Sequence, residues 1–467
     1  MEIDIPAKSA KIALTPDEQI KASAGRAFYV GRGVARTVMI ENAKGVYFWD
    51  TEGKRYLDGS SGAVCSNIGH GNERVKAAIV EQINKCNYIV RTAFTTEATE
   101  TLCALAADLA GTGFDQTFLC SGGSEAVEAA LKLARQYAYV KGEKKRWKVF
   151  GRLPGFHGGT TGATSVTGDP ERDEVFGPTM LIMPKVPAPL SYRIPEGYDR
   201  DSYADHCADC LEQQILKEGP ETVLGFIMEP VGGVSSGALV APDAYYRKVR
   251  EICNRYGVLL ILDEVMSGAG RTGKFLAAHH WPDARPDLIA CAKGLSAGYA
   301  PLGAMLAPNH MVDAVVSSGG FMHGHTYSGN PLSSAVGVAV LNELIDHDLM
   351  SNARKMGELL RARLNDLKDT SPVIGDVRGL GLLNAVEIVA DKATKKVFPA
   401  EIQATYRLSQ IARDHGLHIY ARRAAGGKFG EWIMASPPLI INEQELDEFM
   451  DIFTKSIRIF EEEIGKG

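Results

Sequence analysis

The 467-residue sequence predicts an α/β fold, with a large domain built on a mostly parallel sheet flanked by helices and a smaller α+β domain built from both chain ends. Short apolar runs such as "VLGFIMEPV" and "VLLILDEV" lack the polar alternation of a half-exposed strand, so both faces of their sheet are expected to be covered. Amphipathic stretches such as "SEAVEAALKLARQYAYV" and "APDAYYRKVREICNRYG" alternate with these runs, as crossover helices do in a parallel sheet.

The elements follow one another in three zones. Residues 1–70 are expected to form an N-terminal arm and part of the small domain, and "TVMIENAKGVYFWDTEGKRYLDG" predicts a strand meander with turns at Asn42, Gly45, Asp50 and Gly53. Residues 71–330 are expected to form the large domain. Residues 331–467 are expected to form the C-terminal small domain, with one long helical run over 333–367, two strands in "VIGDVRGLGLLNAVEIV" and a closing helix in "NEQELDEFMDIFTKSIRIFEEEI".

Composition excludes several classes of protein. The formal charge is −6, from 51 Lys+Arg against 57 Asp+Glu, and no long basic run is present, so we expect no nucleic-acid partner. The apolar runs are far shorter than the roughly 20 residues of a membrane span, and the N-terminus lacks the basic start and apolar core of a secretory signal. The eight cysteines are scattered, which suits a reducing compartment. We therefore expect a soluble cytoplasmic protein.

Metal binding is also a weak interpretation of this sequence. Cys207 and Cys210 form a CxxC, but no second pair lies nearby to complete a zinc site, and helical spacing places both on one face with Leu211. The histidine pairs at 279–280 and 323–325 lack a third ligand at suitable spacing. We expect structural thiols and no metal.

The stretch "GAGRTGKF" at 268–275 resembles a phosphate-binding P-loop, and the preceding "VLLILDE" resembles the acidic strand that holds magnesium in ATPases. However, Phe275 replaces the hydroxyl residue that a P-loop needs after its lysine, Lys274. In addition, Glu264 and Gly268 follow one strand, whereas a P-loop enzyme takes the two features from different strands. An ATPase is therefore a remote alternative.

Two other residues favour cofactor chemistry. Asp263 ends an apolar strand, where an isolated charge is costly and a fixed cationic partner is expected. Lys293, in "DLIACAKGLSAG", lies among apolar and small residues that can depress the pKa of its amine. A lysine for a Schiff base and an aspartate for a pyridinium nitrogen are the groups that pyridoxal phosphate requires. The glycines and serine of "CSGGSEAVEAALKLAR" would hold its phosphate at a helix N-terminus.

Six ordered motifs together resemble the class III (ω-) aminotransferases, which are fold type I pyridoxal-phosphate enzymes with a seven-stranded sheet. They are "SGGSEAVEAALKLAR", "GFHGGTTGA", "FIMEPVGG", "LILDEVMSGAGRTGKFLAA", "DLIACAKGLSAGYAPLGAM" and "HTYSGNPLSSA". The likeness covers nearly the whole chain.

The resemblance implies a role for each matching position. Lys293 would bind pyridoxal 5'-phosphate as a Schiff base and shuttle the proton, and Asp263 would keep the pyridine nitrogen protonated. The remaining cofactor-binding positions would be Gly122, Gly123 and Ser124 at the phosphate, Phe156 and Val265 on the two ring faces, and His157 and Glu229 nearby. Thr326 matches a threonine that reaches the phosphate of a partner subunit, which implies a homodimer with shared active sites and leaves a tetramer open.

Substrate positions are less sharply marked. Val64 stands where relatives acting on bulky aryl amines often have tryptophan, so it is expected to line the substrate pocket. The family's carboxylate-binding arginine corresponds to Arg422 or Arg423, and both stay open. Asn330 replaces the histidine of the family's "YSGHP".

The expected activity is ping-pong transamination from an amine or ω-amino acid to a keto acid, with pyruvate as the expected acceptor. A pyridoxal-phosphate-dependent aminomutase or decarboxylase with the same lysine and aspartate is the alternative. An inactive binding or structural protein on the same scaffold is a third possibility, which the intact Lys293 and Asp263 argue against.

Overall fold

The structure is a computed structural model that describes residues 38–465. Residues 1–37 lie outside the described residues. They include the first part of the expected N-terminal arm and the N-terminal stretch that lacks the pattern of a secretory signal. In residues 38–465, no helix combines the length and the apolarity that crossing a membrane requires.

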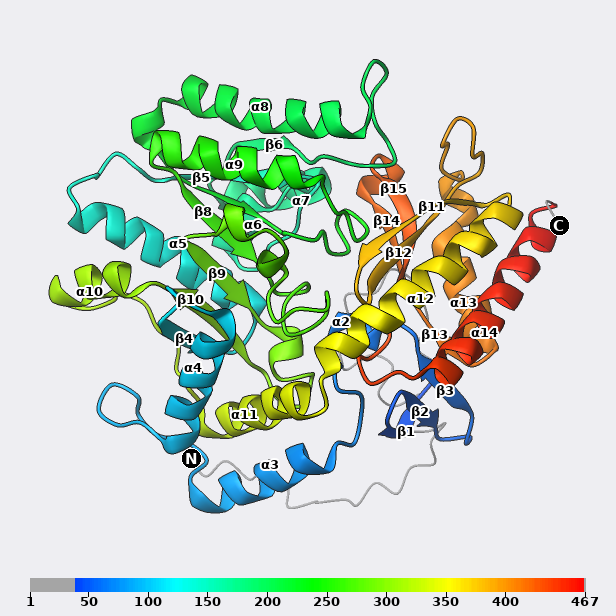
Figure 1. Cartoon of the computed structure of the whole chain (residues 1–467), viewed down its shortest axis with the longest axis horizontal. Helices are drawn as coiled ribbons and strands as arrows, with labels where there is room; N and C mark the ends of the chain where they lie inside the picture. The colour runs from blue at the N-terminus through cyan, green and yellow to red at the C-terminus, as the bar shows by residue number, and fades with distance from the viewer. Residues whose placement is uncertain (1–37, 466–467) are drawn as a thin grey trace, which may run out of the picture.

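A seven-stranded sheet forms the centre of the larger part of the molecule (Figure 1). Its strand order is β4-β10-β9-β8-β7-β5-β6. Strands β5 to β9 are parallel, and β10 is antiparallel to both β4 and β9. The bounds are β4 Gln116–Cys120, β5 Lys148–Leu153, β6 Lys185–Pro187, β7 Val223–Met228, β8 Leu259–Asp263, β9 Leu288–Cys291 and β10 Gly303–Ala307. The predicted α/β class with a mostly parallel sheet is confirmed.

Helices cover both faces of this sheet, because successive side chains of its strands point to opposite sides. In β8, Leu260 and Leu262 join the apolar cluster under α4, α8 and α9, whereas Ile261 joins the cluster under α5 and α10. The bounds are α4 Glu97–Ala110, α5 Gly123–Val140, α8 Arg200–Glu218, α9 Asp243–Tyr256 and α10 Asn309–Ser317. The continuous apolar runs of the sequence are thus strands with two buried faces.

The predicted N-terminal meander is present. Strands β1 (Ile40–Lys44), β2 (Tyr47–Asp50) and β3 (Arg55–Asp58) pair in antiparallel order, with positive φ at Gly45 and Gly53 in the turns. Asn42 was expected in a turn, but it lies within β1 beside a register shift. The short β13 (Leu417–His418) pairs with β3 in parallel, so segments from both ends of the chain share one sheet.

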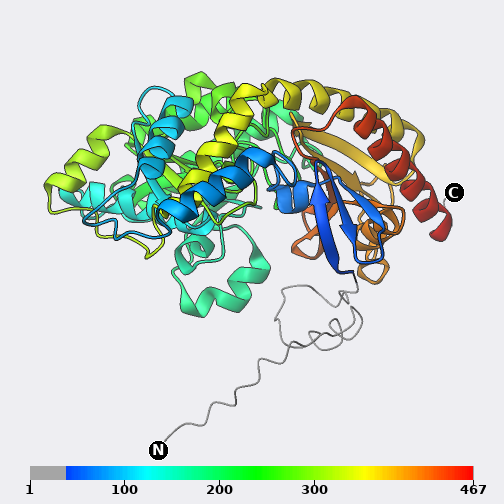
Figure 2. The same cartoon turned by 90° about the horizontal axis from the view of Figure 1, so that it is seen from below.

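The C-terminal segment forms a second four-stranded sheet of order β11-β12-β15-β14, packed against α12 to α14 (Figures 1 and 2). The bounds are α11 Pro331–Asp346, α12 Leu349–Thr370, β11 Ile374–Leu380, β12 Leu383–Ile388, α13 Ala404–Asp414, β14 Tyr420–Ala424, β15 Gly430–Ala435 and α14 Glu443–Glu463. The two predicted strands and the closing helix are confirmed. The single helical run predicted over 333–367 is wrong, since Asp348 has a φ of +45° and separates α11 from α12.

The remaining helices connect these layers. They are α2 Ser61–Val64, α3 Glu73–Lys85, α6 Thr161–Val166 and α7 Pro170–Phe176. Cys207 is buried in the apolar core under α8, and Cys210 Sγ lies 3.5 Å from His206 Nε2. Across residues 38–465, no three His, Cys, Asp or Glu side chains are grouped so that they could hold a metal ion.

The packing of α12 on the turn between β11 and β12 depends on Gly357. A Cβ at this position would lie 1.9 Å from the carbonyl oxygen of Gly381, which is backbone and cannot move aside. We expect Gly357→Ala to lower the free energy of unfolding by about 1–3 kcal/mol through overpacking, although alanine is the better helix former. Urea unfolding measures this. Lys355→Ala, on the exposed side of the same helix, is the control, and equal stabilities of the two variants would contradict the packing explanation.

Candidate active site

Three neighbouring parallel strands deliver the charged candidates to one edge of the sheet. Asp263 is the last residue of β8, Glu229 directly follows β7, and Lys293 lies two residues after β9. Open α/β sheets bind ligands at the carboxyl ends of their strands. The separate sequence candidates therefore meet at one place.

A cavity of about 310 Å³ opens at this edge. All but one of the residues predicted to bind the cofactor line it, and the exception is Thr326. The lining residues are Gly122, Gly123, Ser124, Phe156, His157, Glu229, Asp263, Val265 and Lys293. Cys65 also lines it, next to the amine of Lys293. The structure thus brings together predicted cofactor-binding residues that lie up to 171 positions apart in the chain, between Gly122 and Lys293.

Asp263 is buried and held in a fixed orientation. Its Oδ2 lies 2.8 Å from His157 Nδ1, and its Oδ1 accepts a hydrogen bond of 3.0 Å from the amide of Val265. The His157 amide in turn donates to Thr167 Oγ1. A carboxylate at 4% exposure is stable only when such partners replace water. It places a fixed carboxylate in the wall of the cavity, with which a cationic group could pair.

Lys293 has the environment of a nucleophilic amine. It has a φ of +47°, in the left-handed region that residues other than glycine seldom adopt and that recurs at functional sites. Its Nζ donates a hydrogen bond of 3.0 Å to the carbonyl oxygen of Ala63. Burial lowers the pKa of Lys293, and the negative potential of Cys65, Asp263 and Glu229 only partly offsets that effect. The neutral form of the amine is therefore more accessible than it is for an exposed lysine.

The start of α5 forms a cradle for an anion. Its first residue is Gly123, and the first amides of a helix have no acceptor within the helix. A Cβ at Gly123 would lie 2.7 Å from Val265 Cγ1, whereas one at Gly122 would meet no atom within 4 Å. Ser124 Oγ accepts from the amide of Gly159. The cradle is thus tight on the side of Val265 and open above Gly122, which suits a phosphate group.

Glu229 contributes a second buried carboxylate. Its Oε1 accepts from the amide of Gly233 at 2.9 Å, and both oxygens lie within 3.2 Å of Ser235 Oγ. Its Oε2 lies 3.4 Å from the amide of Phe156. Glu229 therefore anchors the loop after β7 and the backbone beside Phe156.

A second cavity of about 160 Å³ adjoins the first, and Phe156, Val234, Met266 and Lys293 line both. Arg422 lines this second cavity together with Asp169 and Arg172. Asp169 Oδ2 lies 3.3 Å from Arg172 Nε and 3.5 Å from Arg422 Nη2. Two guanidinium groups sharing one carboxylate leave this cavity with a net positive charge.

Arg423 points elsewhere. It forms an ion pair of 3.0 Å with Glu431 and donates to the carbonyl oxygen of Phe398. Of the two arginines left open by the sequence, only Arg422 lines a cavity beside Lys293.

Two predicted site residues besides Arg423 lie outside both cavities. Val64 is 1% exposed and belongs to the apolar core, whereas its neighbours Ala63 and Cys65 line the cavities. Its expected place in the substrate pocket is thus taken by those neighbours. Thr326 is exposed on the surface of the single chain.

The stretch "GAGRTGKF" does not form a phosphate cradle. Lys274 is exposed and donates to the carbonyl oxygen of His279, and Phe275 is buried. Burial raises the pKa of Glu264 to about 7, and its oxygens accept from Ser267 and the amides of Ala277 and Ala278. These contacts hold the loop against the end of β8.

Sequence reasoning missed Arg271, which is fully buried in the same loop, and also Asp169 and Arg172. Arg271 lies in "GAGRTGKF", where Lys274 is the residue that resembles the lysine of a P-loop. Its partners lie more than a hundred residues away in the chain, so no local pattern could identify them.

Comparison with known proteins agrees with this geometry. Residues 29–457 match the family model described as "Aminotransferase class-III". An uncharacterized aminotransferase of Bacillus subtilis, YodT, is 37% identical over 92% of this chain and 96% of its own. A putrescine–pyruvate aminotransferase of Pseudomonas aeruginosa is 32% identical over 90% of each chain. The solved ω-transaminase of Pseudomonas jessenii in complex with PMP superposes with a TM-score of 0.89 at 29% identity, covering 97% of this chain and 100% of its own.

The lowered pKa of Lys293 predicts how the apoprotein captures pyridoxal 5'-phosphate. The neutral amine increases as pH rises through this pKa, so the capture rate should rise with pH and reach half its maximum below the ordinary lysine value of 10.5. Glu229→Gln removes a negative charge that raises this pKa, and should move the midpoint lower. Stopped-flow absorbance measures both rates. A midpoint at or above 10.5, or an upward shift in the variant, would contradict the prediction.

Proposed function

The chain belongs to the class III aminotransferases, which use pyridoxal 5'-phosphate, and on that premise we propose that it transfers an amino group from an ω-amino acid to pyruvate by a ping-pong mechanism. The observation that carries this proposal is the meeting of Lys293, Asp263 and the α5 N-terminus in one cavity, next to a positively charged second cavity.

The residues present fit the cofactor. The first amides of α5 and Ser124 would hold the phosphate, Asp263 the ring nitrogen, and Lys293 the aldehyde carbon. Phe156 and Val265 line the cavity between these groups and would contact the two ring faces. When bound, the cofactor supplies an aldehyde that condenses with amines and a ring that accepts electrons.

Lys293 performs the proton transfers in this proposal. Once released, its neutral Nζ would carry a proton from the amine-bearing carbon of the donor to the cofactor, and in the second half-reaction from the cofactor to the corresponding carbon of the acceptor. Asp263, held by His157 and the amide of Val265, keeps the cationic nitrogen paired throughout.

The second cavity selects the substrate class. Arg422 and Arg172 attract a carboxylate, whereas the distal ammonium of a diamine would face two guanidinium groups whose shared carboxylate is already occupied. This charge favours ω-amino acids as donors and a keto acid as acceptor. Pyruvate as the acceptor is supported by the P. aeruginosa relative, whose name includes it.

We also infer a homodimer in which Thr326 reaches the partner's phosphate site, with a tetramer left open. The surface around Thr326 carries exposed apolar side chains, among them Met322 at 88%, Tyr327 at 63% and Phe94 at 62%. The rings of Tyr88 and Tyr327 lie 6.3 Å apart, and Phe94 lines one cavity with Ser328 and Gly329, so the 88–94 and 327–329 segments form one patch. A patch of this kind is typical of a surface that a second copy covers.

Replacement of Lys293 tests the reaction. We expect the wild-type enzyme to form alanine and the aldehyde of 4-aminobutyrate in equal amounts with pyruvate, and Lys293→Ala to lose at least about 10⁴-fold in rate, because Lys293 is the lysine that lines the cavity and carries the proton in this proposal. Chromatographic product counting with isotope-labelled pyruvate measures this. Isomerised or decarboxylated 4-aminobutyrate without alanine would instead indicate a mutase or decarboxylase.

Charge at the second cavity gives a separate prediction. Arg422→Gln and Arg172→Gln should raise KM for 4-aminobutyrate by roughly 10–100-fold each, the cost of a lost charge-assisted hydrogen bond. Both should leave KM for butylamine, a donor of similar length without a carboxylate, nearly unchanged. Arg423→Gln is the matched control, since Arg423 pairs with Glu431 away from the cavity. A larger effect of Arg423→Gln on 4-aminobutyrate would contradict the assignment.

A further inference from the structure

The segment that supplies the hydrogen-bond acceptor for Lys293 has an unfavourable backbone. The carbonyl oxygen of Ala63 accepts from Lys293 Nζ at 3.0 Å. On either side of it, Ser61 and Val64 have φ values of +50° and +57°, which residues with a Cβ seldom adopt. Such a conformation persists only where the surrounding structure enforces it. Something outside this segment must therefore hold Ala63 against the amine.

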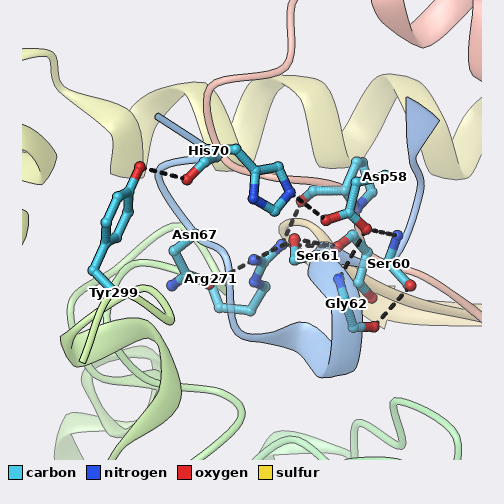
Figure 3. A network of polar contacts seen from close by, with 11 residues as sticks. Asp58, Ser60, Ser61, Gly62, Asn67, His70, Arg271 and Tyr299 are labelled. Atoms are coloured by element: carbon cyan, nitrogen blue, oxygen red, sulfur yellow. Dashed lines mark hydrogen bonds and ion pairs between the residues drawn. The ribbon is translucent and has the colours of Figure 1, made fainter. Parts of the chain in front are cut away.

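Arg271 is the group that holds it. Its guanidinium is fully buried and lies between Ser61 and Asn67 (Figure 3). Nη2 donates to Ser61 Oγ at 2.9 Å and to Asn67 Oδ1 at 2.6 Å. Nη1 donates to three backbone carbonyls of the C-terminal part of the chain, those of Leu382, Ser436 and Pro437. One side chain thus ties together three segments of the fold.

The contacts of the two side chains on the segment complete the network. Ser61 Oγ also donates to the carbonyl oxygen of Ser436, and Asn67 Nδ2 donates to that of Ala269. Behind them, the buried Asp58 accepts from the amide of Gly62 at 2.8 Å and contacts His70 at 3.1 Å (Figure 3). The segment is therefore fixed at Ser61, at Asn67 and at Gly62 between them.

None of the hydrogen-bond acceptors of Arg271 in the described chain is a carboxylate. A buried guanidinium held only by neutral oxygens gains less than one in an ion pair, so its burial is poorly explained by stability alone. Burial lowers the pKa of Arg271 to about 9, which still leaves it charged at neutral pH. Its positive charge acts on Lys293, the residue at the other end of the Ala63 contact.

We propose that Arg271 is a positioning residue for Lys293: it fixes the 61–67 segment so that the carbonyl of Ala63 takes one N–H of the amine and directs its lone pair into the cavity. Lys293 then attacks an aldehyde without first reorienting. This inference rests on the role of Lys293 in the proposed function. The loop at 268–275 thus contributes to catalysis through Arg271, and not through its glycines or Lys274.

The test measures the rate at which apoprotein variants capture pyridoxal 5'-phosphate, by stopped-flow absorbance at a series of pH values. Ser61→Ala and Arg271→Lys weaken the contacts but keep the charge, so capture should slow by roughly 10–100-fold with an unchanged pH midpoint. Arg271→Gln also removes the charge, so its midpoint should move upward. The groups that face Lys293 and set this midpoint are Cys65, Asp263, Glu229 and Arg271. Lys274→Gln, in the same loop but exposed, should behave as the wild type.

Thermal unfolding of each variant separates positioning from stability. Soluble Ser61→Ala protein that captures the cofactor at the wild-type rate would overturn the proposal, even if the Arg271 variants fail to fold. A capture rate that falls only in proportion to the folded fraction would also overturn it. Lys293→Ala separates failure of the proposed function from failure of the positioning role of Arg271. If Lys293→Ala still captures the cofactor covalently, the proposed function fails. If it does not, and Ser61→Ala captures the cofactor at the wild-type rate, only the positioning role fails.

Discussion

Burial of charge at the carboxyl edge of β7, β8 and β9 is the constraint on which the rest of this structure depends. Each charged group there has left water and is stable only with fixed partners. Asp263 is paired with His157, Glu229 with Gly233 and Ser235, and the amine of Lys293 with the carbonyl of Ala63. These hydrogen-bond partners offset the cost of burying each polar group. They also fix the direction of its functional atom, so the same contacts stabilise the fold and preorganise the site.

This constraint links parts of the chain that are distant in sequence. The amine follows β9, its acceptor belongs to the segment after β3, and the guanidinium of Arg271 joins that segment to the turn after β11 and to the loop after β15. The geometry at Lys293 therefore depends on all three sheets. The positively charged second cavity has the same character, since Asp169 precedes α7 and Arg422 lies in β14.

The sequence predicted what is local. Apolar runs ending in Asp263 or leading to Lys293, and glycines before an amphipathic helix, each carry their own signal, and the fold class followed from their alternation. Long-range contacts left no such signal, as Arg271 shows. Neighbouring residues on a strand were also ambiguous: Arg422 and Arg423 are adjacent in β14, and only the sheet decides which faces the cavity, because alternate side chains point to opposite sides.

We propose that the amine that follows β9, on Lys293, is the one that reacts. Borohydride reduction of the protein loaded with pyridoxal 5'-phosphate, followed by peptide mapping, would locate the modified lysine directly. Attachment at Lys293 alone is predicted, because it is the lysine that lines both cavities. Stoichiometric attachment at another lysine, such as the exposed Lys274, with Lys293 unmodified would contradict it.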